Sequence, residues 1–109
     1  MKKIPNRIKT VLKNVKKRLR RVYGGRLREV VLYGSYARGD STAGSDIDVI
    51  VVLDGVKSAF LEIRRCSDAL GDLELESDVL ISILPIAAKD FEERESPVLL
   101  NAKKEGISV

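Results

Sequence analysis

The chain has 109 residues, of which 44% are hydrophobic and 33% charged, and its formal net charge at pH 7 is +4. That length supports one modest hydrophobic core, and no apolar run approaches the roughly 20 residues of a membrane span, so we expect a single domain over 1–109 and no membrane segment. The basic start lacks the apolar stretch of a secretory signal, which predicts a cytoplasmic protein. Histidine is absent, which excludes His-based catalysis and Ser/His/Asp triads and leaves carboxylates as the candidate bases.

The N-terminal segment carries the positive charge. Residues 1–28 hold 12 of the 20 Lys and Arg and none of the 16 acids, so this segment is +12 and the remainder −8. Apolar residues recur every three or four positions over 4–23, which predicts a basic amphipathic helix over 1–23 with Pro5 in its first turn and the glycines 24–25 at its end. Such a run of charge is usually a simply solvated face. The functional alternative is a surface for a nucleic acid, a nucleotide phosphate or an acidic protein, and the sequence does not choose among these three.

A Gly-Ser pair and an Asp-Ile-Asp triplet mark the next segment. We expect a strand over 27–34, a short helix over 35–38, a loop over 39–45 and a second strand over 46–53. Residues two apart in a strand point to the same face, so the carboxylates of Asp46 and Asp48 should converge. Unpaired carboxylates side by side repel each other, and a divalent cation relieves that repulsion. Two Mg²⁺ ions bridged by this pair would form the two-metal arrangement of phosphoryl and nucleotidyl transfer.

The Gly-Ser pair suits the phosphates of a nucleotide. Gly34 allows a phosphate to approach the backbone, and Ser35 offers a hydroxyl at a helix start. Arg38, three residues further on, could neutralise the departing pyrophosphate. Ser45, just before the first aspartate, is a weaker candidate for a phosphate or ribose contact.

A further helix, a further strand and two C-terminal helices are expected after the second strand. We expect a turn at 54–55 and then a helix over 57–70, with Phe60, Ile63 and Leu70 facing inward and Gly71 ending it. A third strand should run over 78–84 until Pro85 ends it. Together with the earlier strands it completes a catalytic core over 27–84, and the C-terminal helices should lie within 87–105, as one helix over 87–94 and another over 97–104.

The chemistry constrains the sheet. If the end of the first strand and the start of the second meet one ligand, those strands are antiparallel. If the third strand begins at the same site, it is parallel to the second and the helix over 57–70 is the crossover. The expected fold class is therefore α/β (α+β), with a small mixed sheet flanked by helices. Asp78, at the start of the third strand, is then the third carboxylate, as metal ligand and possible base, while Cys66 is expected to be structural.

Gly34, Ser35, Asp46, Asp48 and Asp78 resemble the signature of the nucleotidyltransferase superfamily that includes DNA polymerase beta, poly(A) polymerases and the antibiotic nucleotidyltransferases. The stretches 32–39 and 45–48 are especially similar to the minimal nucleotidyltransferases. The resemblance implies the polymerase beta-like fold and NMP transfer. It also implies a frequent partner, a helical HEPN protein that is often a toxic ribonuclease, with the minimal nucleotidyltransferase as its antitoxin; some such antitoxins transfer AMP from ATP to a tyrosine of the toxin.

Three functions follow as hypotheses. The first is an enzyme that moves AMP from ATP to a hydroxyl of a partner that brings its own binding surface, since few residues remain for a second pocket. The second is an antitoxin that neutralises its partner by occlusion, with vestigial nucleotide binding. The third is a nucleic-acid-binding module that uses residues 1–28, against which the absence of interleaved aromatic residues counts.

Overall fold

The structure is a computed structural model that describes residues 4–42, 44–93 and 96–109. A four-stranded mixed sheet with the strand order β3-β2-β1-β4 forms its centre. The elements, in chain order, are α1 (Asn6–Tyr23), a 3₁₀ turn (Gly24–Arg26), β1 (Leu27–Tyr33), α2 (Ser35–Arg38), β2 (Ile47–Leu53), α3 (Ala59–Ser77), β3 (Ile81–Ala87), α4 (Ala88–Glu93), α5 (Pro97–Glu105) and β4 (Ile107–Ser108). No helix in this described part is long and apolar enough to cross a membrane.

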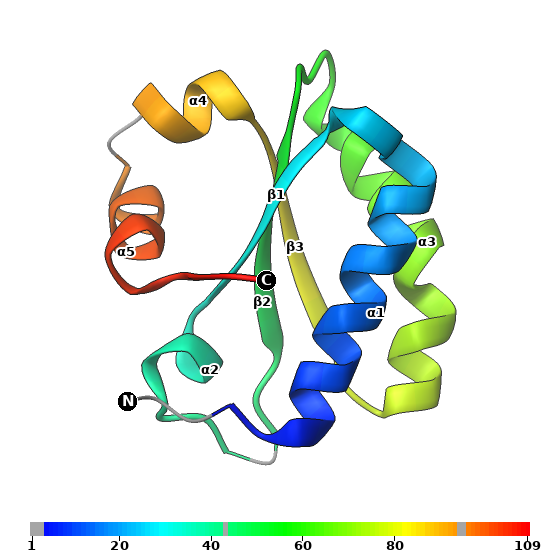
Figure 1. Cartoon of the computed structure of the whole chain (residues 1–109), viewed down its shortest axis with the longest axis vertical. Helices are drawn as coiled ribbons and strands as arrows, with labels where there is room; N and C mark the ends of the chain where they lie inside the picture. Colours follow the sequence, from blue (N-terminus) through cyan, green and yellow to red (C-terminus); the bar gives the residue numbers. More distant parts are fainter. Residues whose placement is uncertain (1–3, 43, 94–95) are drawn as a thin grey trace.

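Helices cover the sheet on both faces. Helices α1 and α3 pack on one face and α4 and α5 on the other, so that β1 and β2 are sandwiched between two apolar layers (Figure 1). The strands β1 and β2 are antiparallel, and β2 and β3 are parallel with α3 as the crossover. The mixed sheet and its strand directions are therefore as the sequence predicted. The basic helix is also confirmed over Asn6–Tyr23, because one side of α1 is buried against the sheet while its lysines and arginines line the other side. Residues 1–3 of its predicted range lie outside the described residues.

Helix α3 differs from the prediction in its length and its buried side. It continues through Gly71 to Ser77, because a mid-helix glycine costs only about 1 kcal/mol relative to alanine and the extra turns bury Leu73. The expected inward residues Phe60 and Ile63 are exposed, at 71% and 43%, whereas Leu70 is buried as predicted. The side of α3 that faces the core is set by four residues at helical spacing, namely Glu62, Cys66, Leu70 and Leu73.

The third strand begins later and ends later than predicted. Because α3 takes up the residues as far as Ser77, β3 starts at Ile81 and the expected strand start at Asp78 is wrong. Pro85 does not end the strand but lies inside it, paired with Val51. The strand tolerates it because β3 is an edge strand, where a missing N–H need not break a ladder. The predicted end of the following helix, at residue 94, lies outside the described residues.

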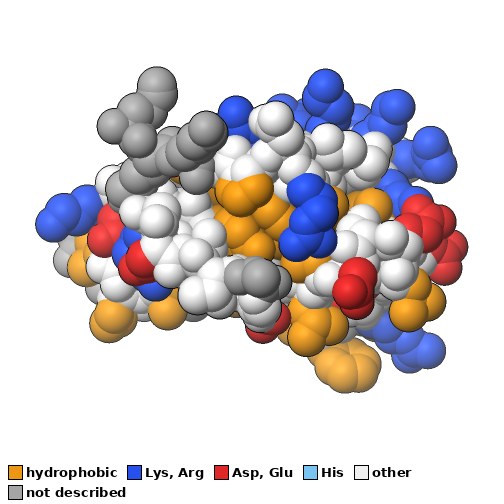
Figure 2. Space-filling model, turned by 90° about the horizontal axis from the view of Figure 1, so that it is seen from below, with side chains coloured by type: hydrophobic (Ala, Val, Ile, Leu, Met, Phe, Trp, Pro, Cys, Tyr) orange, Lys and Arg blue, Asp and Glu red, His pale blue; other side chains and the backbone are white. Residues whose placement is uncertain are grey.

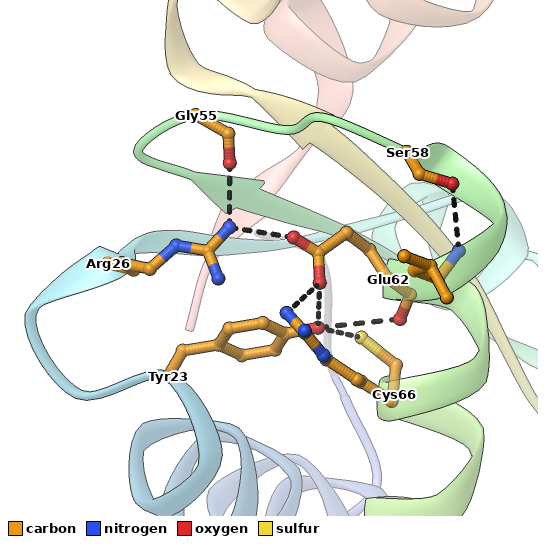
Figure 3. A network of polar contacts seen from close by, with 8 residues as sticks. Tyr23, Arg26, Gly55, Ser58, Glu62 and Cys66 are labelled. Carbon is orange, nitrogen blue, oxygen red and sulfur yellow. Dashed lines mark hydrogen bonds and ion pairs between the residues drawn. The ribbon is translucent and has the colours of Figure 1, made fainter.

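A buried carboxylate links α1, the 3₁₀ turn and α3. Glu62 is 3% exposed, and its carboxylate accepts hydrogen bonds from Arg26 at 2.7 Å, Arg65 at 3.1 Å and the Tyr23 hydroxyl at 3.2 Å (Figure 3). Burial acts to raise the pKa of Glu62, but the hydrogen bond and charge of Arg26, with smaller contributions from Tyr23 and Arg65, outweigh it and leave the pKa lowered. The Tyr23 hydroxyl also lies 3.4 Å from the buried Cys66 thiol, which confirms Cys66 as a packed structural residue.

We expect Glu62→Ala to destabilise the fold by about 2–3 kcal/mol at pH 7, since it removes the buried carboxylate that accepts from the Tyr23 hydroxyl, Arg26 and Arg65. Glu62→Gln, which retains an acceptor of similar volume, should cost less. Because the folded pKa is lowered, the contribution of the carboxylate is present above its ordinary pKa of about 4.3 and is lost as the pH falls through the lower folded value. Urea unfolding of both variants and the parent at pH 7 and at pH 3 measures this. A Glu62→Ala cost below about 0.5 kcal/mol at pH 7 would contradict it.

Candidate functional site

The two halves of the predicted motif meet at one end of the sheet. The register of β1 and β2 places Tyr33 opposite Asp48, so the glycine that follows β1 lies beside the second aspartate. Gly34 has φ +75° and ψ −155°, a conformation that L side chains rarely adopt. A Cβ built on Gly34 would collide with Oδ2 of Asp48. Glycine is therefore required there for both its backbone conformation and its lack of a side chain.

The charge of Asp46 acts on Asp48. Asp46 is exposed at the end of the loop, whereas Asp48 is partly buried as the second residue of β2. Burial and then the negative charge of Asp46 raise the pKa of Asp48, and the positive charge of Arg38 lowers it in part. A carboxylate whose charge is disfavoured by a neighbouring carboxylate is suited to a divalent cation, and one or two carboxylates plus substrate phosphates are the usual ligands of Mg²⁺. The pair therefore fits one magnesium ion.

Arg38 lies on the same side as the carboxylates. Its guanidinium Nε donates to the carboxylate of Asp40 at 3.2 Å, and its side chain is 44% exposed. It is close enough to Asp48 to stabilise that carboxylate's charge. An exposed ion pair of this kind costs little to break, so Arg38 can turn towards a phosphate.

The two predicted serines have different positions. Ser35 is the first residue of α2, directly after Gly34, and is partly buried. The Ser45 hydroxyl accepts a hydrogen bond at 2.8 Å from the backbone N–H of Thr42, whose carbonyl accepts the N–H of Ser45 at 3.0 Å. Ser45 therefore closes the loop that leads to Asp46, and its hydroxyl is already engaged.

Asp78 is not brought to the carboxylate pair. It caps the C-terminus of α3 in the left-handed conformation, with φ 51° and ψ 48°. It lines a separate cavity of about 250 Å³ with Glu74 and three apolar neighbours, Leu75, Val79 and Leu80. Within the described ranges, no three Asp, Glu or Cys side chains are grouped so that they could hold a metal ion. The residue that the register places opposite Asp48 on β3 is Ser82, so the role of Asp78 stays a prediction.

A cavity beside the motif contains residues that the sequence did not single out. It has a volume of about 170 Å³ and is lined by Tyr33, Gly34, Arg38, Val98, Asn101 and Glu105. Burial, and then the charge of Asp48, raises the pKa of the Tyr33 hydroxyl, which places this tyrosine at the site rather than only in the core. Its position before Gly34, opposite the Asp-x-Asp strand, could have indicated this, whereas nothing in the sequence of α5 pointed to Asn101 or Glu105.

The basic side of α1 borders a different cavity. A groove of about 580 Å³ runs between α1 and β4, with an apolar floor and five cations, and includes none of Gly34, Arg38, Asp46 and Asp48. Its lining residues are Ile4, Lys9, Leu12, Lys13, Lys16, Lys17, Arg20, Leu32, Ile107, Ser108 and Val109. Figure 2, which views the molecule from the α2 end, shows apolar side chains at the centre and Lys and Arg side chains gathered along the α1 side. This is the surface that the nucleic-acid hypothesis would use.

Comparison with known proteins identifies the family. A family model described as "Nucleotidyltransferase domain" matches residues 12–105, which include both halves of the motif. The chain belongs to the nucleotidyltransferase domain family. Its fold is the polymerase beta-like nucleotidyltransferase fold, as the resemblance implied.

Relatives of this nucleotidyltransferase domain occur among archaeal proteins. One is the "Putative protein adenylyltransferase MJ0604" of Methanocaldococcus jannaschii, which is 53% identical over 36 residues, 33% of this chain and 36% of that protein. Another is the "Protein adenylyltransferase MntA" of Thermococcus cleftensis, 34% identical over 71 residues, 63% of this chain and 70% of that protein. The matched stretch thus spans about a third of the first relative's length and 70% of the second's.

Solved structures share the fold at low sequence identity. A toxin–antitoxin crystal structure with AMP-PNP has a TM-score of 0.62 at 18% identity and covers 88% of this chain and 70% of that one. A putative nucleotidyltransferase from Sulfolobus solfataricus has a TM-score of 0.61 at 21% identity and covers 99% and 89%, respectively. The nucleotidyltransferase architecture therefore extends over nearly the whole chain.

Proposed function

We propose that this protein is a Mg²⁺-dependent protein adenylyltransferase of the cytoplasm that moves AMP from ATP to a side-chain hydroxyl of a HEPN toxin and thereby acts as its antitoxin. The observation that carries the proposal is the contact of Gly34 with the Asp48 carboxylate, beside Asp46 and Arg38. The names of the relatives, protein adenylyltransferases, and of the structural neighbours, toxin–antitoxin complexes of which one contains AMP-PNP, support it.

In the proposed reaction, the acceptor oxygen forms a bond to the α-phosphorus of ATP while the bond from that phosphorus to the bridging oxygen breaks, and pyrophosphate departs. The acceptor proton passes to a carboxylate. Asp46 and Asp48 would hold Mg²⁺, which when bound neutralises phosphate oxygens. Gly34 leaves space for the phosphates beside these carboxylates, and Arg38 stabilises the charge of the leaving pyrophosphate.

A second metal ion would need Asp78 as a third carboxylate ligand beside Asp46 and Asp48. In this arrangement Asp78 caps α3 outside the carboxylate pair, so its proposed roles require the connection between α3 and β3 to move towards Asp46.

Label transfer tests the proposal. The protein is incubated with ATP labelled at the α-phosphate, with Mg²⁺, and with the product of the neighbouring gene. We expect label on that partner, dependent on Mg²⁺ and accompanied by loss of its toxicity. Label on no protein, together with a neutralised partner, would instead favour the occlusion hypothesis.

A further inference from the structure

The cavity of about 170 Å³ beside the motif joins the proposed phosphate site to helix α5. Gly34 and Arg38 form its motif side, and Val98, Asn101 and Glu105 of α5 form the other. Helix α5 is held in place because Leu99 and Ala102 are buried against the sheet and because the Ser96 hydroxyl accepts the N–H of Leu99 at its start. A nucleotide whose phosphates lie at Gly34 therefore has an adjacent cavity with fixed walls.

The size of the cavity suits a single ring system. A volume of 170 Å³ corresponds to between five and six waters at about 30 Å³ each, which is below the about 300 Å³ at which sites for whole drug-sized ligands begin. Its walls include the half-buried side chain of Tyr33 and the aliphatic side chain of Val98. An aromatic side chain offers a stacking surface to any base and does not distinguish one base from another. The polar groups of the cavity must then select the base.

Asn101 and Glu105 supply those groups. They are four residues apart on α5, so both side chains lie on the same side of the helix, and both line the cavity. The asparagine amide offers a donor and an acceptor, and the carboxylate offers acceptors alone. Adenine presents an exocyclic amino group, which donates, next to ring nitrogens, which accept, and a carboxamide pairs with these two in a bidentate manner.

Resting on the proposed nucleotidyl transfer, we propose that Asn101 and Glu105 are the residues that select the base and that they select adenine. Asn101 pairs with the amino group and N7, and Glu105 accepts the second amino N–H. Hypoxanthine has a carbonyl in place of that amino group, so it would present two acceptors to Asn101, which could then form only one of its two hydrogen bonds, and would direct an oxygen at the carboxylate of Glu105. The site should therefore discriminate ATP from ITP by about tenfold or more, since hydrogen bonds to charged groups are among the stronger ones.

Titration calorimetry with Mg²⁺ measures the dissociation constants of ATP and ITP for the full chain and for Asn101→Ala, Glu105→Gln and Lys104→Ala. Lys104 is an exposed residue of the same helix that does not line the cavity, so its variant is the matched control. The ratio of the two constants is the readout, because removing the charge of Glu105 changes the affinity for both triphosphates alike. We expect the parent and Lys104→Ala to prefer ATP by about tenfold or more, and the other two variants to prefer it by less than about threefold. Thermal unfolding checks that all variants are folded.

The outcomes separate the two proposals. If the parent binds both triphosphates equally, or if the ratio is unchanged in Asn101→Ala and Glu105→Gln, base selection by α5 is wrong while the nucleotide site stands. If the parent binds no nucleoside triphosphate, the proposed function itself is wrong, and base selection falls with it.

Discussion

Asp48→Asn should reduce nucleotidyl transfer at least about 100-fold while leaving the protein folded, and in the absence of metal it should be at least as stable as the parent at pH 7. Loss of activity is expected because Mg²⁺ stabilises phosphate charge by several kcal/mol, and each 1.36 kcal/mol of barrier corresponds to a factor of ten in rate. Retained stability is expected because Asp48 is disfavoured as an anion in the metal-free fold, by its burial and by Asp46. An amide of the same shape removes that repulsion.

The pH dependence of this stability difference follows from the direction in which the pKa of Asp48 is shifted. The folded pKa of Asp48 is raised, so the folded state binds this proton more tightly than the unfolded chain does. The cost of the ionised carboxylate is therefore present above the folded pKa and disappears as the pH falls towards the ordinary aspartate value of about 3.9. Thermal unfolding in EDTA at pH 7 and at pH 4 should show a stability gain for Asp48→Asn only at pH 7, and added Mg²⁺ with ATP should stabilise the parent but not the variant.

Asp68→Asn is the matched control, because Asp68 is an exposed acid on α3 and its variant should behave as the parent in both assays. A variant at Asp48 that transfers label at the parent rate would show that this carboxylate holds no catalytic metal. If the Asp48 variant unfolds in EDTA at pH 7, then the ionised Asp48 stabilises the metal-free fold, which contradicts the direction of its pKa shift.

The motif half of the site could be predicted from the sequence because it depends on neighbouring residues. Gly34, the start of α2 and the aspartates at the start of β2 are local features, and the requirement that they meet one ligand fixed the antiparallel direction of β1 and β2, which the register confirms. The position of Asp78 could not be obtained in this way. Whether α3 ends at Gly71 or continues depends on the packing of Leu73 against the core, and that tertiary gain exceeds the local cost of one glycine.

The α5 side of the cavity could not be predicted from the sequence, for a related reason. Asn101 and Glu105 lie 67 and 71 residues after Gly34 in the chain and are polar residues on the short helix α5, a pattern that fits any solvated surface. Only the folding of α5 over the same side of the sheet as Tyr33 brings them to the motif. The β4 strand was missed because its two residues form a ladder only through their contact with β1.

Gly34→Ala should destabilise the fold by about 2–6 kcal/mol and abolish nucleotide binding. Two costs add. The first is the backbone conformation, φ +75° and ψ −155°, in a region that only glycine adopts readily, at about 1–3 kcal/mol. The second is the collision of the new Cβ with Oδ2 of Asp48, and forcing an extra carbon into a packed position typically costs another 1–3 kcal/mol. Nucleotide binding is lost because the methyl group fills the approach to the carboxylate.

Gly24→Ala separates these two costs, because Gly24 also has a positive φ of +56° and ψ of −128° but an added Cβ meets nothing within 4 Å. Urea unfolding should therefore give a larger loss for Gly34→Ala than for Gly24→Ala, and only the Gly34 variant should fail to bind ATP. The double variant Gly34→Ala/Asp48→Ala lacks the colliding Oδ2 and Cγ of residue 48 and keeps only its Cβ, 3.3 Å from the added Cβ. The cost of the Gly34 change measured in that background should therefore fall most of the way towards the Gly24→Ala value. Equal costs in the parent background would show that Gly34 does not contact Asp48, and the phosphate site would then have to lie elsewhere on the sheet edge.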